Sequence, residues 1–371
     1  MRGIIHGALD PTVTARSAAD AAPNLVHWPD LARRRAFDAW LAPLLPEHRL
    51  DPATLAPASA DASFRRYLRI AAGGGRSVIV MDAPPPQEDV RPFVAIARRI
   101  EQAGLHAPRI LAVDEVHGFV LLSDLGSRLY LDALREASAG EADGLMRTAI
   151  GALVQWQTRI DASGWPAYDD ALLRRELALF PDWCVQREFG QTWSDAQQAH
   201  WRSICDLLVA SALAQPRVGV HRDWMPRNLM VTEPNPGILD FQDATLGPIT
   251  YDIASMLRDA FLSWDEEREI DWAVRWWQQM RGSAAMSGHP MAEDFGEAWR
   301  ALEWMGLQRH LKVLGIFCRL KHRDGKPKYS ADLPRFFAYA TRVANRYAPL
   351  QPLLGLLEPL SGMAVKAGYT F

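Results

Sequence analysis

The sequence has few cysteines and no long apolar run. Of its 371 residues only Cys184, Cys205 and Cys318 are cysteines, and no two of them have the spacing of a C-x-x-C motif. We therefore expect neither a disulfide framework nor a structural zinc site, and a reducing cytoplasm fits this pattern. Because no long apolar segment lies near the N-terminus, the sequence predicts no signal peptide and no membrane span.

An excess of charge of one sign is also absent. The formal net charge is −3, and 49% of the residues are hydrophobic, which is ordinary for a globular enzyme. A nucleic-acid partner would require a concentrated basic face, so we expect none. A chain of this length can bury a substantial core in a two-lobed domain. Nothing in the composition decides the oligomeric state.

The chain does contain the spacing of a phosphoryl-transfer loop. An H-R-D motif ends at Asp223, Asn228 follows five residues later, and Asp240 ends a short apolar run. ATP-dependent phosphoryl transfer needs a carboxylate that orients the attacking hydroxyl and oxygen ligands that hold Mg²⁺ against the triphosphate. We therefore assign Asp223 as the base, Asn228 and Asp240 as Mg²⁺ ligands, and ATP as the donor. Each residue alone also suits an Asx-rich turn.

Periodicity predicts a β-rich segment followed by a mostly helical one. A glycine run at 73–75 separates two strand patterns and predicts a hairpin. We expect a small lobe of five strands and one helix, and we interpret the arginine run at 33–35 as a solvated helix face. Strands are expected at 64–70, 77–82, 109–113 and 118–122, and helices at 29–45, 89–103, 145–160, 201–213, 252–264, 266–280 and 295–320.

The nucleotide site departs from the protein-kinase pattern. No G-x-G-x-x-G loop is present, and Met81 stands in the strand where kinases usually carry a phosphate-pairing Lys or Arg. Side chains before the first expected strand can contact the phosphates instead, although its arginines also suit a solvated strand edge. Backbone groups after the last expected strand should bond the adenine edge. The predicted nucleotide contacts are Ser63, Arg65, Arg66, Ser123, Asp124 and Leu125, and the acidic partners considered for the phosphate-pairing residue are Glu88 and Glu101.

The catalytic segments resemble those of the aminoglycoside phosphotransferase and choline kinase branch of the kinase-like superfamily. Pro226 follows the catalytic loop's Met225, and Asp240-Phe241-Gln242 is followed by Asp252, whereas an Ala-Pro-Glu segment is absent. The resemblance implies an α+β, bilobal protein-kinase-like fold with a small β-rich lobe and a larger helical lobe. We accordingly expect a flexible extension at 1–27, an N-terminal lobe at 28–122, a hinge at 123–126 and a helical C-terminal lobe at 127–371.

Longer motifs narrow the resemblance. Segments 61–67, 80–85, 121–126 and 304–317 look like those of the bacterial anomeric N-acetylmuramate/N-acetylglucosamine kinases of cell-wall recycling, and the likeness covers roughly residues 30 to 345. It implies transfer of the ATP γ-phosphate to the C1 hydroxyl of a free amino sugar. An arginine is expected to pair with the muramate carboxylate. The predicted sugar contacts are Asp243, Arg309, His310 and Arg319, although Arg309 and His310 also suit contacts between helices.

Two other functions fit parts of the sequence. A kinase of the same fold could act on an aminoglycoside or choline, but a cationic substrate favours an acidic or aromatic pocket, and segment 304–317 contains Arg and His instead. A catalytically silent nucleotide-binding scaffold would explain the missing strand lysine. The presence of Asp223, Asn228 and Asp240 together argues against that second alternative.

Overall fold

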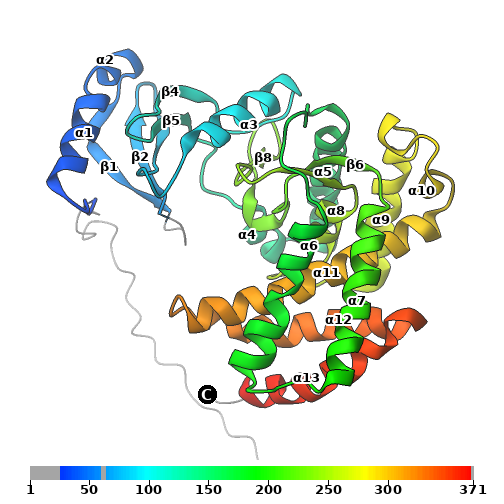
Figure 1. Ribbon diagram of the computed structural model, residues 1–371. Helices are drawn as coiled ribbons and strands as arrows, with labels where there is room; N and C mark the ends of the chain where they lie inside the picture. The colour runs from blue at the N-terminus through cyan, green and yellow to red at the C-terminus, as the bar shows by residue number, and fades with distance from the viewer. Residues whose placement is uncertain (1–25, 60–63, 369–371) are drawn as a thin grey trace, which may run out of the picture. The chain divides into compact units, whose positions relative to one another are not determined.

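The computed structural model describes residues 26–59 and 64–368, which form two compact units (Figure 1). The first unit contains the described residues up to Asp89 together with Ala112–Leu122. The second contains Val90–Leu111 and the described residues from Ser123 onward. The expected α+β class is confirmed. The helix at the start of the second unit falls inside the range 28–122 that the sequence assigned to one lobe, but its contacts group it with the helical unit.

The first unit is built on a five-stranded sheet with the order β1-β2-β3-β5-β4. Gly74 and Gly75 have φ angles of 77° and 71° between β2 and β3, so the predicted hairpin is confirmed. The sequence did not predict β1, whose two prolines disguise a strand but are tolerated because β1 lies at the sheet edge. The strands are β1 (Asp51–Ser59), β2 (Arg66–Ala72), β3 (Arg76–Asp82), β4 (Ile110–Asp114) and β5 (Phe119–Ser123).

Two short helices, α1 (Leu31–Leu41) and α2 (Leu44–His48), replace the single helix expected at 29–45. The Phe37 ring packs edge-on against Phe119, with 5.5 Å between centroids. Arg33 is not a solvated charge, because its Nε donates to buried Asp82 at 3.0 Å. A buried carboxylate requires a compensating charge, so the interpretation of the arginine run as a solvated face was wrong at Arg33.

The second unit is helical, with two short antiparallel strand pairs that carry the catalytic loops. None of the helices in the described part of the chain is both long and apolar enough to cross a membrane. The pairs are β6 (Arg217–Val220) with β9 (Thr245–Pro248) and β7 (Leu229–Met230) with β8 (Gly237–Ile238). The α-helices are α3 (Val90–Gln102), α4 (Tyr130–Glu136), α5 (Ala139–Arg159), α6 (Asp170–Leu177), α7 (Asp195–Leu213), α8 (Tyr251–Leu257), α9 (Glu266–Met280), α10 (Pro290–Glu293), α11 (Phe295–His322), α12 (Leu333–Arg346) and α13 (Leu354–Gly368). The 3-10 and π segments are η1 (Phe180–Glu188, a π-helix), η2 (Pro226–Asn228), η3 (Ala284–Met286), η4 (Pro327–Asp332) and η5 (Ala348–Leu353).

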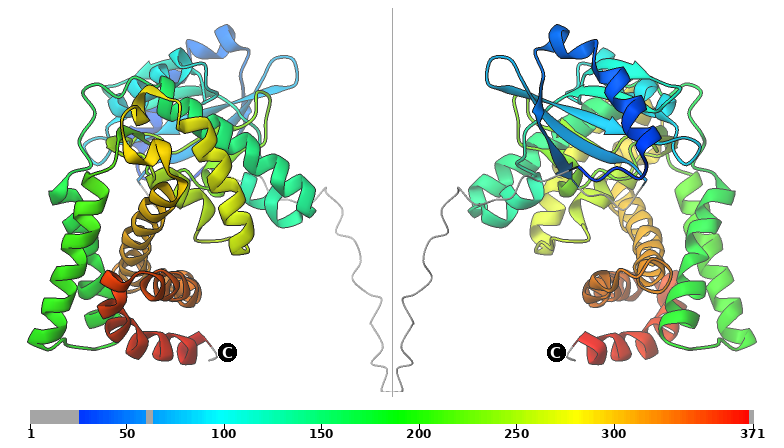
Figure 2. Two further views of the ribbon diagram at one scale, coloured as in Figure 1. Left: turned by 90° about the vertical axis from the view of Figure 1, so that its right-hand side faces the viewer. Right: turned by 90° about the vertical axis from the view of Figure 1, so that its left-hand side faces the viewer.

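The 28-residue helix α11 is the core of this unit, where it packs against η1, α7, α8 and α12 (Figure 2). Gly315 permits the close crossing of α11 with the start of η1, because a Cβ there would lie 2.4 Å from the backbone of Leu179. Helix α8 ends at Leu257 rather than near residue 264. Asp259 accounts for this early end, because its carboxylate accepts the backbone N–H groups of the following turn at Phe261 and Leu262.

Candidate active site

Buried carboxylate Asp252, on α8, holds the catalytic loop. Its two oxygens accept the backbone N–H groups of His221 at 2.7 Å and of Arg222 at 3.0 Å. The loop begins directly after β6, and Trp156 fixes that strand by donating from Nε1 to Gly219 O at 2.9 Å. The residues before Asp223 are therefore anchored to two different helices.

Asn228 brings the three predicted catalytic residues together. Its Nδ2 donates to the backbone oxygen of Asp223 at 2.9 Å and to Oδ2 of Asp240 at 3.3 Å. Gln242 donates to the other oxygen, Oδ1, of Asp240 at 2.9 Å. Strands β7 and β8 set this spacing, since Asn228 directly precedes one and Asp240 follows the other by two residues.

The donor set suits a hard cation that also binds phosphate oxygens. Among the described residues, no group of three or more His, Cys, Asp or Glu side chains is arranged to hold a metal ion. Mg²⁺ commonly needs only one or two protein oxygens when a nucleotide supplies others. Both hydrogen bonds of Asn228 use Nδ2, so its amide oxygen is uncommitted by them. Asn228 and Asp240 therefore fit the expected metal role.

Burial sets the protonation of the groups beneath the loop. Complete burial lowers the pKa of His221 to about 4, so the ring is neutral at pH 7 and its Nδ1 can accept the N–H of Asp223 at 3.3 Å. Burial raises the pKa of Asp252 to about 7, against the lowering effect of its two backbone donors and of Arg309. Both side chains also bond the backbone of the loop and thereby orient it.

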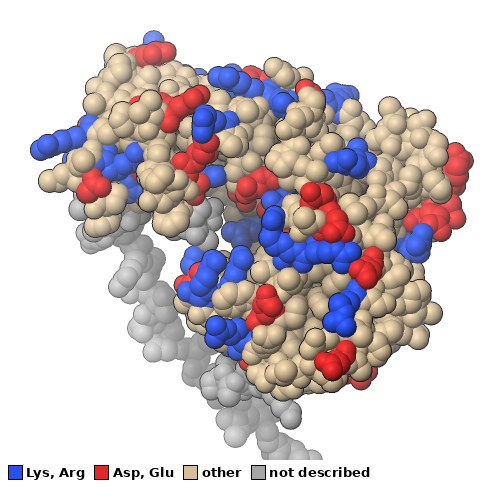
Figure 3. All heavy atoms as spheres, viewed as in Figure 1, with Lys and Arg blue, Asp and Glu red and all other residues tan. Residues whose placement is uncertain are grey.

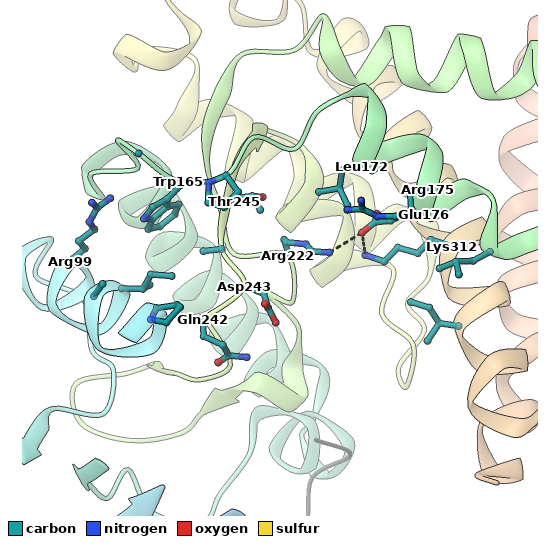
Figure 4. A pocket seen from close by; sticks show the side chains of 18 of the residues that line it. Arg99, Trp165, Leu172, Arg175, Glu176, Arg222, Gln242, Asp243, Thr245 and Lys312 are labelled. Carbon is teal, nitrogen blue, oxygen red and sulfur yellow. Dashed lines mark hydrogen bonds and ion pairs between the residues drawn. The ribbon is translucent and has the colours of Figure 1, made fainter. Parts of the chain in front are cut away.

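A cavity of about 820 Å³ lies beside these residues, wholly within the second unit (Figure 4). Its walls come from α3, α6 and α11 and from the loops around β6 and β9. Gln242 connects it to the catalytic cluster, because this side chain lines the cavity and donates to Asp240. The polar and aromatic lining residues are Arg99, Trp165, Arg175, Glu176, Arg222, Gln242, Asp243, Thr245, Lys312 and Arg319.

Glu176 organises one wall of the cavity. Its Oε1 receives Nη2 of Arg222 at 2.8 Å and Nζ of Lys312 at 2.8 Å, as the dashed lines of Figure 4 show. The Tyr168 hydroxyl and Gln308 donate to its other oxygen. Burial opposes the charge of Glu176, but Lys312 and the other donors hold its pKa below the usual range. The cluster thus joins α6, α11 and the catalytic loop.

The four predicted sugar residues fall into two places. Asp243 and Arg319 line the cavity. Arg309 and His310 are buried and are not part of its lining. Arg309 lowers the pKa of the buried carboxyls of Asp252 and Asp259, which burial raises, so it acts as their countercharge. The His310 ring stacks on Tyr339, with 4.8 Å between centroids. Arg309 and His310 therefore make contacts between helices, which was the alternative considered for them.

Sequence reasoning did not assign roles to Glu176, Arg222 and Lys312. Arg222 belongs to the H-R-D motif and Lys312 to segment 304–317. Neither motif gave a reason to place these side chains in a cavity. Glu176 carried no sequence signal, since a carboxylate on an amphipathic helix is usually solvated.

The two arginines among the predicted nucleotide contacts of the first unit already have protein partners. Arg65 Nε donates to Glu88 at 2.8 Å, and Arg66 forms an ion pair with Asp82 across β2 and β3. Ser63 lies outside the described residues. Glu88, one of the two acidic residues considered, is thus the partner of an arginine, as a phosphate-pairing residue requires.

The expected hinge is held by local hydrogen bonds. Ser123 Oγ accepts the backbone N–H of Arg109 at 2.8 Å, and Asp124 Oδ1 accepts that of Gly126 at 2.9 Å. Leu125 is buried. The side chains of Ser123 and Asp124 therefore shape the segment. The bonding of adenine by its backbone stays a prediction.

Lys and Arg side chains gather, with some Asp and Glu between them, on the face over α6 and α11 (Figure 3). The cavity itself contains more cations than carboxylates. The cations are Arg99, Arg175, Arg222, Lys312 and Arg319, and the carboxylates are Glu176 and Asp243. This balance suits an anionic or neutral ligand better than a polycation.

Solved structures share this fold. An ADP-bound aminoglycoside phosphotransferase, APH(2'')-Ib, superimposes with a TM-score of 0.57 at 13% identity, over 85% of this chain and 99% of that chain. A choline/ethanolamine kinase family protein from Mesorhizobium loti gives a TM-score of 0.56 at 15% identity, over 88% and 99%. At these identities the likeness establishes the fold alone.

Sequence comparison identifies much nearer relatives. The N-acetylmuramate/N-acetylglucosamine kinase of Pseudomonas aeruginosa is 52% identical over 89% of this chain and 98% of its own length. The protein of the same name from Neisseria meningitidis is 44% identical over 92% and 100%. The phosphotransferase enzyme family matches residues 54–289, more than half of the chain. These matches show that the chain belongs to the phosphotransferase enzyme family.

Proposed function

We propose that this protein transfers the γ-phosphoryl group of ATP to the C1 hydroxyl of N-acetylglucosamine and N-acetylmuramate, giving sugar 1-phosphates. The observation that carries the proposal is the arrangement of Asp223, Asn228 and Asp240 beside a cation-rich cavity. The names of relatives that match nearly their whole length supply the sugar. The C1 position rests on the sequence resemblance.

In the proposed reaction, Asp223 accepts a hydrogen bond from the C1 hydroxyl and takes its proton. The sugar oxygen forms a bond to the γ-phosphorus while the bond from that phosphorus to the bridging oxygen breaks, and ADP leaves. An anomeric hydroxyl is more acidic than an ordinary alcohol, so a carboxylate suffices as base. Positioning of the two reactants contributes most of the rate. Asn228 and Asp240 would hold Mg²⁺, which supplies charge neutralisation on the phosphates when bound.

Arg65 is the proposed phosphate contact in the first unit. Its pairing with Glu88 at 2.8 Å supports this role, because the phosphate-pairing lysine of kinases is oriented by a glutamate in the same way. Arg66 is less suited, since it pairs with Asp82, whose exposed fraction is 1%.

The sugar is proposed to occupy the cavity, where Arg319 pairs with the muramate carboxylate. Arg319 lines the cavity, and its Nε has no hydrogen-bond partner among the described residues. A guanidinium with donors to spare matches a planar carboxylate in two-point geometry. Asp243 is proposed to accept a sugar hydroxyl.

The proposal is tested by ATP turnover with N-acetylglucosamine, N-acetylmuramate, an aminoglycoside and choline, each with and without Mg²⁺. We expect turnover with the two amino sugars only, and only with Mg²⁺. Turnover with the aminoglycoside or choline in place of the sugars would replace this function by the alternative one. No turnover with any acceptor would favour a silent scaffold.

The same assay locates the carboxylate contact. Arg319→Ala should raise the KM for N-acetylmuramate about 10-fold or more, since a charge-assisted hydrogen bond contributes roughly 1.5–3 kcal/mol. The KM for N-acetylglucosamine, which lacks the carboxylate, should change much less. An equal loss with both sugars would remove Arg319 from this role.

A further inference from the structure

Arg222 is held in the cavity wall in an unusual way. Its φ angle of 77° lies in the left-handed region, which residues other than glycine adopt at a cost. The backbone N–H donates to Asp252 at 3.0 Å and Nη2 donates to Glu176 at 2.8 Å. Hydrogen bonds of the backbone and of the side chain thus hold Arg222 in this strained conformation, and its side chain lines the cavity (Figure 4).

The guanidinium keeps donors that the fold does not use. Arg222 Nη2 donates to Glu176, and Nε is buried without a hydrogen-bond partner among the described residues. Lys312 differs, because its Nζ donates to Tyr251 at 3.0 Å as well as pairing with Glu176. A guanidinium in a cavity wall whose N–H donors are not all satisfied can donate a hydrogen bond to a bound ligand.

Chain position restricts which part of a ligand Arg222 can meet. It directly precedes Asp223, the residue proposed to bind the C1 hydroxyl. Apart from the ring oxygen, the sugar group nearest to the reacting oxygen is the substituent on the neighbouring carbon, C2. In the proposed substrates that group is an acetamide, whose carbonyl oxygen is a neutral acceptor.

We infer that Arg222 selects the 2-acetamido group by donating to its carbonyl oxygen, and that Glu176 is the positioning residue that presents the guanidinium. The inference rests on the proposed function, because it requires the C1 hydroxyl at Asp223. A neutral acceptor suits this place, since the Arg222 guanidinium already forms an ion pair with Glu176. The muramate carboxylate is better matched to Arg319, which lines the cavity and whose Nε has no hydrogen-bond partner among the described residues.

The test compares N-acetylglucosamine with glucose, which lacks the acetamide. Arg222→Gly should lower kcat/KM for N-acetylglucosamine about 10- to 100-fold, as expected for the loss of a hydrogen bond from a charged donor. For glucose the same variant should lose less than about 3-fold, because no contact disappears. If the wild-type rate with glucose is too low to measure, its inhibition constant against N-acetylglucosamine replaces kcat/KM.

The strained backbone supplies a matched pair of variants. Arg222→Gly and Arg222→Ala both remove the guanidinium, but only glycine adopts the φ angle of 77° without strain. We expect equal losses of N-acetylglucosamine preference in the two variants and a higher Tm for the glycine variant. Both should fold, because Lys312, Tyr168 and Gln308 still neutralise or bond Glu176.

Two further variants complete the test. Glu176→Gln should raise the KM for N-acetylglucosamine more than it lowers kcat, because it releases the guanidinium without touching the base. Arg174→Ala, on the same helix but outside the cavity lining, should leave the preference unchanged.

The outcomes separate this inference from the proposed function. If the wild-type protein phosphorylates none of these sugars, the proposed function fails and this inference fails with it. If the wild type is active but Arg222→Gly loses both sugars equally or neither, only this inference is overturned. A selective loss of N-acetylmuramate over N-acetylglucosamine would also overturn it, because Arg222 would then bind the carboxylate.

Discussion

At the scale of single residues, the catalytic loops contain backbone conformations that side chains rarely adopt. Arg222 and Asp240 both have positive φ, at 77° and 61°. For residues other than glycine such a conformation costs roughly 1–2 kcal/mol. The hydrogen bonds of Asp252 to the first loop and of Gln242 to Asp240 oppose this cost. The strain coincides with the residues assigned to chemistry, where pre-organised geometry has a use.

Asp223 is predicted to be the base. Asp223→Asn keeps the size of the side chain but cannot take the hydroxyl proton, so kcat should fall by about 10²- to 10⁴-fold. ATP binding, measured by calorimetry in the presence of Mg²⁺, should be nearly unchanged. Near-normal turnover in this variant would show that the proton goes elsewhere.

As Mg²⁺ ligands, Asn228 and Asp240 are predicted to differ in how much activity is lost when each is replaced by alanine. Asp240→Ala removes a charged oxygen ligand and should abolish activity at any practical Mg²⁺ concentration. Asn228→Ala removes a neutral ligand and one hydrogen-bond partner of Asp240, so a higher Mg²⁺ concentration should partly restore turnover. A titration of rate against Mg²⁺ measures both, and wild-type behaviour of Asp240→Ala at low Mg²⁺ would refute the assignment.

Arg65 and Arg66 give a contrast in the first unit. Arg65→Ala should raise the KM for ATP or depress kcat, because a charge-assisted phosphate contact is lost. Arg66→Ala should act mainly on stability, since it removes one of the two guanidinium partners of buried Asp82. Steady-state ATP kinetics and thermal melts distinguish the two effects. If neither variant alters ATP kinetics, another group holds the phosphates.

At the scale of elements, α11 connects the cavity with the core. Its residue Lys312 contacts Glu176 of α6, and its residue Glu303 lies in a buried ion cluster. Glu303 accepts hydrogen bonds from Arg258 at 2.9 Å, from Arg346 at 2.7 Å and from the Tyr347 hydroxyl at 2.7 Å. The cluster joins α11 to the end of α8 and to the end of α12.

Removing the Glu303 carboxylate should therefore destabilise the folded protein. Glu303→Ala leaves the fully buried Arg258 with one carboxylate, Glu269, and should lower the free energy of unfolding by about 3–5 kcal/mol. Glu297→Ala on the same helix is the matched control, because its partner Arg300 is exposed, and the change should stay within about 0.5 kcal/mol. Urea denaturation measures both. Equal effects would show that the cluster contributes no more than a surface pair.

Some elements could be read from the sequence and others could not. The hairpin at Gly74 and Gly75 and the long helix α11 follow from turn chemistry and periodicity. Strand β1 was not predicted because it contains prolines, which central strands exclude. Its position at the edge of the sheet becomes known only from the strand order. The early end of α8 depended on a buried carboxylate, Asp259, whose capping bonds local sequence does not reveal.

At the scale of the whole molecule, the sequence predicted that Asp223, Asn228 and Asp240 lie together, but it did not predict the cavity. Asp223, Asn228 and Asp240 are close in the chain and carry a fixed spacing. The cavity takes Arg99 from α3 and Lys312 from α11, which lie over two hundred residues apart in sequence. Such a meeting depends on tertiary packing. For the same reason, the sequence alone could not show that Arg319 lines the cavity whereas Arg309 and His310, on the same helix, are buried outside its lining.

The most direct test of the central claim is the phosphorus NMR spectrum of the product formed from N-acetylglucosamine, ATP and Mg²⁺. We predict a sugar phosphate resonance coupled to the anomeric proton, because the C1 oxygen is the nucleophile held by Asp223. A resonance coupled to the C6 methylene protons would contradict this account, and so would the absence of any sugar phosphate.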